Sequence, residues 1–250
     1  MVKAKVLKTL RKKIEKAYRL DIPSTLGSGS FCFQVSNIPS CSSDVKVSAG
    51  ANDKVVGNTA DDPSQVSERE LSIEFSLSSE ISADTMQRCM DLFERNMGEM
   101  YSKSSWGLDL DEKLKDLSHK QSRFLLVFDK MNENSNDSAG RSLVAFLNFR
   151  FCLDDDEHPE CAVFYVYELQ VEPSYRNAGI GRHLMDQAET LAAAGEMDKT
   201  ILTVFVSNSG AMEFYKRLGY CEDESSPRQN GDTAADYEIL SKKTNRSNVN

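Results

Sequence analysis

Apolar positions near the start of the chain recur every three to four residues and then become sparse. They are Val6, Leu7, Leu10, Ile14, Tyr18 and Leu20. This spacing predicts a helix over residues 1–20. Residues 21–67 are instead rich in Ser, Gly, Asn, Asp and Pro and have no regular apolar period, which predicts a long loop or a disordered linker.

Regular patterning begins at about residue 68 and continues to the last strand. Apolar residues alternate with polar ones from Leu71 to Leu77, as in a half-buried strand, and Ser82 or Asp84 caps the helix that follows, to about Met100. Further elements are expected in the order helix, three strands, helix, strand, helix, strand. Their ranges are 111–119, 123–129, 143–152, 162–171, 179–195, 200–206, 209–218 and 236–241.

This order of elements predicts an α+β fold built on a mixed sheet. Antiparallel strands come first, and a β-α-β-α-β series follows them. We expect the folded domain to span residues 68–244, with a short tail at 245–250. Residues 1–20 and 21–67 are expected to precede the domain as a basic helical segment and a linker.

Charge is distributed unevenly along the chain. The net charge is -9, but residues 1–20 hold eight Lys or Arg and one acid, Glu15, so this segment carries +7 and the remainder about -16. An acidic body favours cationic partners through long-range attraction. Two interpretations stay open for the basic segment, namely contact with an anionic partner and a solvated helix face.

Several functional classes find no support in the sequence. No run of about 18 apolar residues occurs, and no apolar stretch follows the basic start, so we expect no membrane association and a protein of the nucleus and cytoplasm. The six cysteines and three histidines are scattered without metal-ligand spacing. No metal cofactor, and no serine-histidine-aspartate triad, is therefore expected.

The stretch from Tyr167 to His183 carries the main chemical signal. A strand is followed by a turn with Arg176, Gly179 and Gly181 in the pattern R-x-x-G-x-G, which opens a helix. Glycines let the backbone approach a phosphate, and the free amides of a first helical turn attract one. An ordinary tight turn is the alternative, but the G-x-G-x-x-G pattern of dinucleotide folds is absent.

A second half of the signal lies about 30 residues downstream, where a strand is followed by Asn208, Ala211, Phe214 and Tyr215. Together the two halves resemble the coenzyme A signature of the GNAT superfamily of N-acetyltransferases. The resemblance implies a GNAT fold, with acetyl-CoA as co-substrate between splayed parallel strands. The residues that it assigns to acetyl-CoA are Leu169, Gln170, Val171, Arg176, Asn177, Ala178, Gly179, Ile180, Gly181, Arg182, His183, Asn208, Ala211 and Phe214.

Within that superfamily, residues 68–244 resemble the NatD enzymes, which acetylate the α-amino group of histones. Four stretches carry this resemblance: Met100-Tyr101 with Ser105-Trp106-Gly107, Phe149-Arg150-Phe151, Tyr165-x-Tyr167-Glu168-x-Gln170, and Ser225-Ser226-Pro227 with Tyr237-Glu238-Ile239-Leu240-Ser241. It implies a monomeric enzyme that binds histone tails and no specific nucleic acid. The expected substrate is the Ser-Gly-Arg-Gly terminus of histones four and two-A.

The same resemblance implies a set of catalytic residues. Glu168 corresponds to the general base, and Tyr167 and Tyr215 are the other catalytic candidates, with Tyr215 able to protonate the CoA thiolate. The amide of Val171 is the candidate oxyanion donor. An alternative stays open for Glu168: the side chain could form a structural ion pair with a basic residue or simply face solvent. Alternation along the strand places Glu168 and Gln170 on one face and Tyr165, Tyr167 and Leu169 on the other, unless a bulge intervenes.

The expected peptide site is mainly aromatic. Its candidates are Tyr101, Trp106, Asp154, Tyr165, Tyr167 and Tyr237. The family pattern has an aspartate directly after Phe-Arg-Phe, but this chain has Cys152 there, so Asp154 is the substitute candidate for binding the substrate arginine. Two rival hypotheses remain: a GNAT enzyme acting on lysine or small amines, and a histone-binding module without activity.

Overall fold

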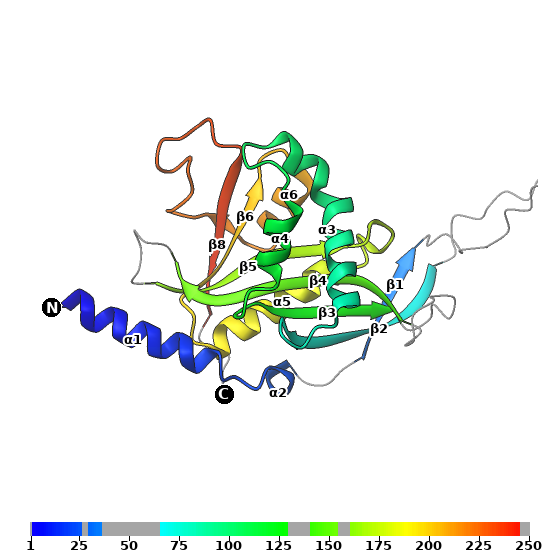
Figure 1. The fold of residues 1–250 in the computed structure, drawn as a ribbon, viewed down its shortest axis with the longest axis horizontal. Coiled ribbons are helices and arrows are strands. Elements are labelled where there is room, and N and C mark those ends of the chain that lie inside the picture. Colours follow the sequence, from blue (N-terminus) through cyan, green and yellow to red (C-terminus); the bar gives the residue numbers. More distant parts are fainter. Residues whose placement is uncertain (1, 27–29, 37–65, 130–140, 155–160, 246–250) are drawn as a thin grey trace, which may run out of the picture.

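An eight-stranded mixed sheet organises the described part of the chain (Figure 1). The computed structural model describes residues 2–26, 30–36, 66–129, 141–154 and 161–245. The strands in spatial order are β1 (Ser30–Ser36), β2 (Val66–Leu77), β3 (Arg123–Asp129), β4 (Ser142–Leu153), β5 (Ala162–Val171), β6 (Lys199–Phe205), β8 (Tyr237–Lys243) and β7 (Cys221–Glu222). Among these described strands, β5 and β6 form the one parallel pair.

Seven helical elements accompany the described strands. They are α1 (Val2–Ala17), α2 (Ile22–Leu26), α3 (Ala83–Lys103), α4 (Leu110–Leu117), the 3-10 turn η1 (Pro173–Tyr175), α5 (Ile180–Ala194) and α6 (Ser209–Arg217). Side-chain caps explain where three of them begin: Ser82, Asp109 and Asn208 each accept a hydrogen bond from the backbone amide three residues later. Every helix and strand predicted after residue 68 is present, and in that part of the chain the sequence missed the two-residue strand β7 and the three-residue turn η1 among the described elements.

Helices cover both faces of the central strands, and two cores result. On one face Leu125, Val127 and Leu147 pack with residues of α1 and α5. On the other face Phe124 and Leu126 pack with residues of α3 and α4. Because successive side chains of a strand point to opposite faces, β3 is buried at all seven positions.

The parallel strands β5 and β6 are paired over only part of their length. The pairing joins Val163–Val166 of β5 to Lys199–Leu202 of β6. Beyond these positions β5 stays on β4 and β6 stays on β8, so the two strands separate at their C-terminal ends. Open parallel strands of this kind commonly place a ligand at their C-terminal edge.

A β-bulge in the β4–β5 pair corrects the simple alternation expected for β5. Asn148 pairs with Glu168 and Phe149 pairs with Val166, which leaves Tyr167 as the extra residue. Arg150, two positions beyond Asn148 on the same face of β4, then pairs with Tyr165. The bulge therefore brings Tyr165 to the face that holds Glu168, whereas strict alternation placed the two on opposite faces.

The N-terminal region also differs from expectation. Leu10 and Ala17 of α1 and Ile22 of α2 are buried in the first core, so the predicted basic helix is packed against the sheet. The strand β1 pairs with β2 along its whole length. The prediction of a loop or linker over residues 21–67 is therefore wrong at Ile22–Leu26 and Ser30–Ser36. Residues 27–29 and 37–65 of that segment lie outside the described part.

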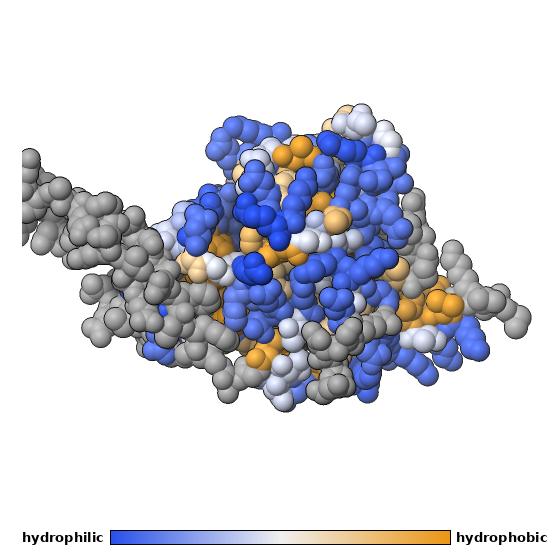
Figure 2. Space-filling view, turned by 180° about the vertical axis from the view of Figure 1, so that it is seen from behind, coloured by the Kyte–Doolittle hydropathy of each residue, from blue (hydrophilic) through white to orange (hydrophobic). Residues whose placement is uncertain are grey.

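The surface opposite to the view of Figure 1 is largely hydrophilic, and its apolar residues show only in small separate areas (Figure 2). None of the described helices has the length and apolar character needed to cross a membrane.

Candidate active site

The turn between β5 and α5 has the backbone geometry that an anion site needs. Asn177 and Gly179 adopt positive φ angles of 63° and 90°. This left-handed conformation suits glycine, and it directs the chain into α5 so that the first amides of the helix stay open. A Cβ atom on Gly181 would lie 3.3 Å from the ring of Phe214, so a glycine here lets α6 approach the start of α5 closely.

This turn borders a cavity of about 480 Å³, here called the cofactor cavity. It lies between the start of α5, helix α3 and helix α6. Twelve of the residues expected at the acetyl-CoA site line it: Leu169, Gln170, Val171, Arg176, Asn177, Gly179, Ile180, Gly181, Arg182, Asn208, Ala211 and Phe214. Ala178 and His183 do not line it. Ala178 packs against the first core, and the ring of His183 lies 3.3 Å from the amide of Gln187.

The amide of Val171 points into the opening between the parallel strands. Val171 lies opposite Ala145, and the next amide, that of Glu172, donates to Val144 on β4 at 2.8 Å. Because successive amides of a strand point to opposite sides, the amide of Val171 is directed away from β4. It therefore faces the gap left by β6, where the sequence predicts an oxyanion donor.

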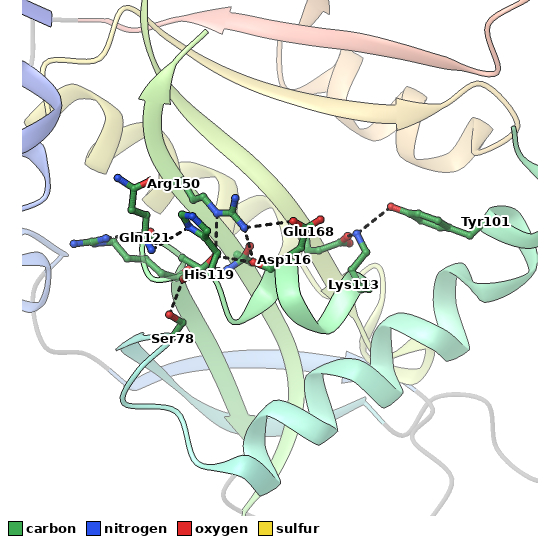
Figure 3. Close-up of polar contacts among 11 residues, drawn as sticks. Ser78, Tyr101, Lys113, Asp116, His119, Gln121, Arg150 and Glu168 are labelled. Carbon is green, nitrogen blue, oxygen red and sulfur yellow. Dashed lines mark hydrogen bonds and ion pairs between the residues drawn. The ribbon is translucent and has the colours of Figure 1, made fainter. Parts of the chain in front are cut away.

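Glu168 is buried and ion-paired. Its side chain is 7 % exposed, and one carboxylate oxygen lies 2.8 Å from the ammonium of Lys113 on α4. The other accepts a 2.8 Å hydrogen bond from Gln170. Lys113 also donates to the hydroxyl of Tyr101 at 3.2 Å, and Figure 3 shows it reaching between these two residues. The ion pair that the sequence left open as an alternative thus exists.

The surroundings of Lys113 keep its side chain charged. Burial by itself lowers the pKa of Lys113, but the charge of Glu168, the phenol of Tyr101 and the hydrogen bonds to both raise it, and the net pKa is well above its ordinary value. Lys113 therefore stays an ammonium at neutral pH. Its ammonium is a fixed positive charge at hydrogen-bond distance from the carboxylate of Glu168.

Glu168 and Lys113 belong to a second cavity of about 260 Å³, here called the acceptor cavity. Four of the predicted substrate residues line it: Tyr101, Trp106, Tyr165 and Tyr167. The ring of Tyr237 lies 4.9 Å from that of Trp106 and supports it from outside the lining. The side chain of Trp106 is 48 % exposed, so the aromatic wall reaches the mouth of the cavity.

Two aromatic residues of β5 are held in place by polar neighbours. The hydroxyls of Tyr165 and Thr203 lie 2.6 Å apart across the parallel pair. The guanidinium of Arg150 stacks on the ring of Tyr167 at 4.1 Å and donates to the backbone carbonyl of Asp116. These contacts fix the wall of the acceptor cavity that faces α4.

Asp154 does not line the acceptor cavity, contrary to expectation. Its carboxylate lies 2.6 Å from the ammonium of Lys199, and the side chain is only 2 % exposed. Besides Glu168, the acid that lines this cavity is Asp116, whose side chain is 53 % exposed. Helical spacing contains a signal for it, because Asp116 follows Lys113 by three residues on α4 and shares its face.

The two cavities adjoin at a common set of residues. These are Met97, Leu169, Asn208, Ala211 and Tyr215. Burial, together with the nearby charge of Glu168, raises the pKa of Tyr215 above its ordinary value. Tyr215 is therefore a protonated hydroxyl at the point where a molecule in one cavity would meet a molecule in the other.

Asn96 on α3 connects the cofactor turn to the buried carboxylate, and the sequence motifs do not include it. Its amide donates to the side chain of Gln170 at 3.0 Å and to the backbone carbonyl of Val171 at 3.1 Å. Its carbonyl accepts a 2.7 Å hydrogen bond from Arg176. A polar chain thus extends from Arg176 through Asn96 and Gln170 to Glu168.

The thiol of Cys152 is poorly suited to carry an acyl group. Burial, followed by the charge of Asp154, raises the pKa of Cys152 to about 12, so its thiol is protonated and is a poor acyl acceptor. Among the described residues, no group of three or more His, Cys, Asp or Glu side chains is placed to hold a metal ion.

Comparisons with known proteins identify a matching family. The sequence profile of the Acetyltransferase (GNAT) family matches residues 86–220, more than half of the chain. The chain is 33 % identical over 60 residues to N-alpha-acetyltransferase 30 of Xenopus laevis, a match that covers 24 % of this chain and 22 % of that protein. It is 42 % identical over 59 residues to an uncharacterized N-acetyltransferase of Methanocaldococcus jannaschii, covering 24 % of this chain and 26 % of that protein.

These two matches thus span about a quarter or less of the length of each curated relative. Among solved structures, Arabidopsis thaliana NAA60 in complex with a bisubstrate analogue is 14 % identical. That comparison covers 70 % of this chain and 100 % of the other, with a TM-score of 0.48.

Proposed function

The chain belongs to the Acetyltransferase (GNAT) family, and from this premise we propose that it transfers an acetyl group from acetyl-CoA to the α-amino group of a protein N-terminus. Its fold, a mixed sheet with one parallel pair among the described strands and helices on both faces, is the GNAT fold. The observation that carries the proposal is the meeting of the two cavities at Tyr215, beside the buried carboxylate of Glu168.

The cofactor cavity fits acetyl-CoA by its chemistry. The open amides at the start of α5 suit the pyrophosphate, with Arg176 and Arg182 nearby as cations. The gap between β5 and β6 admits the pantetheine arm, and the amide of Val171 is directed there. The thioester would then lie near Tyr215, at the junction of the cavities.

The proposed reaction is a direct transfer within a ternary complex. The substrate ammonium first loses a proton to Glu168, directly or through water, since an N-terminal amine has a pKa of about 7.7 to 8.0. The amine lone pair then attacks the thioester carbon, and the amide of Val171 stabilises the oxyanion. The C–S bond breaks, Tyr215 protonates the thiolate, and the second proton of the nitrogen, released as the new amide forms, restores Tyr215 through water. The proton first taken by Glu168 leaves to solvent.

An N-terminal acceptor is favoured over a lysine side chain by the shape of the acceptor cavity. Aromatic rings from Tyr101, Trp106, Tyr165 and Tyr167 enclose a volume of about 260 Å³, which suits a small first residue such as serine. The Xenopus relative is an N-alpha-acetyltransferase, which supports this proposal for the matched stretch.

For the identity of the substrate, we propose the Ser-Gly-Arg-Gly terminus of histones, as in the NatD enzymes, with action in the nucleus and cytoplasm. The resemblance of residues 68–244 supports this choice, as does the acidic body of the chain, which attracts basic tails. Asp116 replaces Asp154, the residue expected from the resemblance, as the carboxylate for the arginine, because Asp116 lies in the wall of the acceptor cavity and is exposed.

The test is mass spectrometry of a Ser-Gly-Arg-Gly peptide after incubation with acetyl-CoA and the protein. We expect one acetyl group on the free peptide and none on a copy with a blocked amino terminus and an added lysine. Glu168→Gln should lower kcat by about a hundredfold or more, because a general base contributes about 10²- to 10⁴-fold. Glu112→Gln, an exposed residue of α4, is the matched control and should retain full activity.

Each alternative has its own outcome in this experiment. Equal modification of the blocked, lysine-bearing copy would assign the activity to lysine side chains. Acetylation of free termini irrespective of the third residue would retain the N-terminal activity and refute the arginine contact with Asp116. No reaction with any peptide, together with no acetyl-CoA binding by calorimetry, would favour a binding module.

A further inference from the structure

Lys113 lies in the wall of the acceptor cavity, and neither the coenzyme A signature nor the proposed reaction gives it a role. Its side chain is 14 % exposed, and its ammonium lies 2.8 Å from Glu168. The rings of Phe93 and Tyr101 approach the ammonium at 4.8 and 5.1 Å. A fixed cation is thus held beside the carboxylate that would receive the proton of the substrate.

We propose that Lys113 is a positioning residue whose fixed charge disfavours the ammonium form of the substrate amine in the acceptor cavity and so promotes loss of its proton. This inference rests on the proposed function, since it concerns an amine that must lose its proton before it attacks. It assigns to the ion pair a role in catalysis in addition to its contribution to packing.

The argument is one of charge balance in a poorly hydrated site. A lone buried carboxylate would attract the ammonium form of the substrate and hold it in a form that cannot attack. With Lys113 in place, Glu168 already has a cation, and a second cation entering the cavity is repelled at short range. The cavity therefore binds the neutral amine relatively better, so that less of the binding energy stabilises the unreactive state.

Other charged groups near Lys113 do not remove this effect. Tyr101 on α3 is neutral, because burial and then the charge of Glu168 raise its pKa. Asp116 on α4 is more than half exposed, so water screens it, and its nearest described cation is Arg150 on β4 at 3.9 Å. Glu168 on β5 is thus the buried charge that Lys113 balances.

The experiment compares the pH dependence of kcat for the wild-type protein and Lys113→Met, with a free-terminus peptide and acetyl-CoA both saturating. We expect the acidic limb of the variant to move to higher pH by about one unit or more. At pH 7 its kcat should fall while its KM for the peptide stays equal or decreases, because Glu168 is then free to pair with the substrate ammonium. Lys113→Arg, which keeps the charge, should leave the limb near its wild-type position.

Two controls separate this role from a structural one. Lys115→Met removes an exposed charge from the same helix and should leave the profile unchanged. Acetyl-CoA binding by calorimetry should be equal in the wild-type protein and Lys113→Met, and if the latter does not fold, Lys113→Gln takes its place. A uniform loss of kcat at all pH values without movement of the limb would overturn the proposal, as would an equal movement in Lys113→Arg.

The outcome for Lys113 is distinguishable from the outcome for the proposed function. Acetylation of a free peptide terminus by the wild-type protein tests the function alone. A stationary acidic limb in the variant, with that activity present, rejects only the role of Lys113.

Discussion

At the scale of single residues, the hydroxyl of Tyr215 gives a prediction about the departing thiolate. Tyr215→Phe should lower kcat by about tenfold or less, below the usual range for general acids, because a thiolate leaves well without a proton. Burial and the charge of Glu168 raise the pKa of Tyr215. Its deprotonation should therefore not lower kcat of the wild-type protein at any pH up to the ordinary pKa of tyrosine. Steady-state kinetics with a free-terminus peptide measures both effects.

Retained acetyl-CoA binding by the same variant is the control for its folding. A loss of kcat as large as that of Glu168→Gln would show that Tyr215 does more than protonate the leaving group.

Most residues that line the cofactor cavity could be predicted from sequence, whereas the pairing of Glu168 with Lys113 could not. Arg176, Gly179 and Gly181 are close in sequence and owe their arrangement to one turn, so a local pattern identifies them. Lys113 and Glu168 are 55 residues apart and meet only when α4 packs on the sheet. No spacing rule predicts such a contact, and the same reason explains why Asn96 was missed.

At the scale of secondary structure, the helix α1 is part of the folded unit. Its residues Leu10 and Ala17 are buried, and Lys13 lies 3.0 Å from Asp198, just beyond α5. The hydroxyl of Tyr18, which follows the helix, donates to the carbonyl of Phe151 at 2.6 Å. A basic amphipathic pattern predicts the helix, but it does not say whether the apolar side has a partner.

Removal of residues 1–20 is therefore expected to destabilise the protein and, through it, to lower activity. Leu10→Ala alone should reduce the free energy of unfolding by about 2 kcal/mol or more, because it leaves a cavity in the first core. Thermal unfolding followed by circular dichroism measures both variants. Lys5→Gln with Lys8→Gln, at exposed positions of α1, is the matched control and should unfold like the wild-type protein.

If the shortened chain instead kept the unfolding temperature and peptide activity of the full chain, α1 would be a dispensable arm. The segment before residue 68 would then contribute little to the stability of the folded protein, as expected for a linker.

At the scale of the whole molecule, one buried charge cluster joins parts of the chain that lie far apart in sequence. The ammonium of Lys199 on β6 lies 2.6 Å from Asp154, at the end of β4, and 2.7 Å from Asp223, which follows β7. In the sequence, Asp154 begins a run of four acids over residues 154–157, a pattern that is typical of a solvated loop or a binding site. Its buried role depends on Lys199, 45 residues later, so it follows from the folded arrangement and not from the local pattern.

This cluster makes stability depend on pH in a defined direction. Burial tends to raise the pKa of Asp223, but hydrogen bonds from Lys199, Ser241 and Ser225 lower it to about 2, below its ordinary value of 3.8. A carboxyl group with a depressed pKa in the folded state stabilises that state above its unfolded pKa, and this contribution disappears as the pH falls from about 3.8 to about 2. Asp223→Asn should cost about 2 kcal/mol near neutral pH, since it removes a hydrogen bond to a charged group.

Denaturant unfolding measures this dependence. It is carried out on the wild-type protein and Asp223→Asn, from neutral pH down to the lowest pH at which both remain folded. The difference in free energy should be largest above pH 4 and should shrink as the acid limit is approached, because protonation of Asp223 then removes from the wild-type protein what the substitution has already removed. Asp111→Asn, at an exposed position of α4, should differ little from the wild-type protein at any pH. A constant difference for Asp223→Asn across the range would mean that its cost comes from packing and not from the charge that holds β4, β6 and the segment after β7 together.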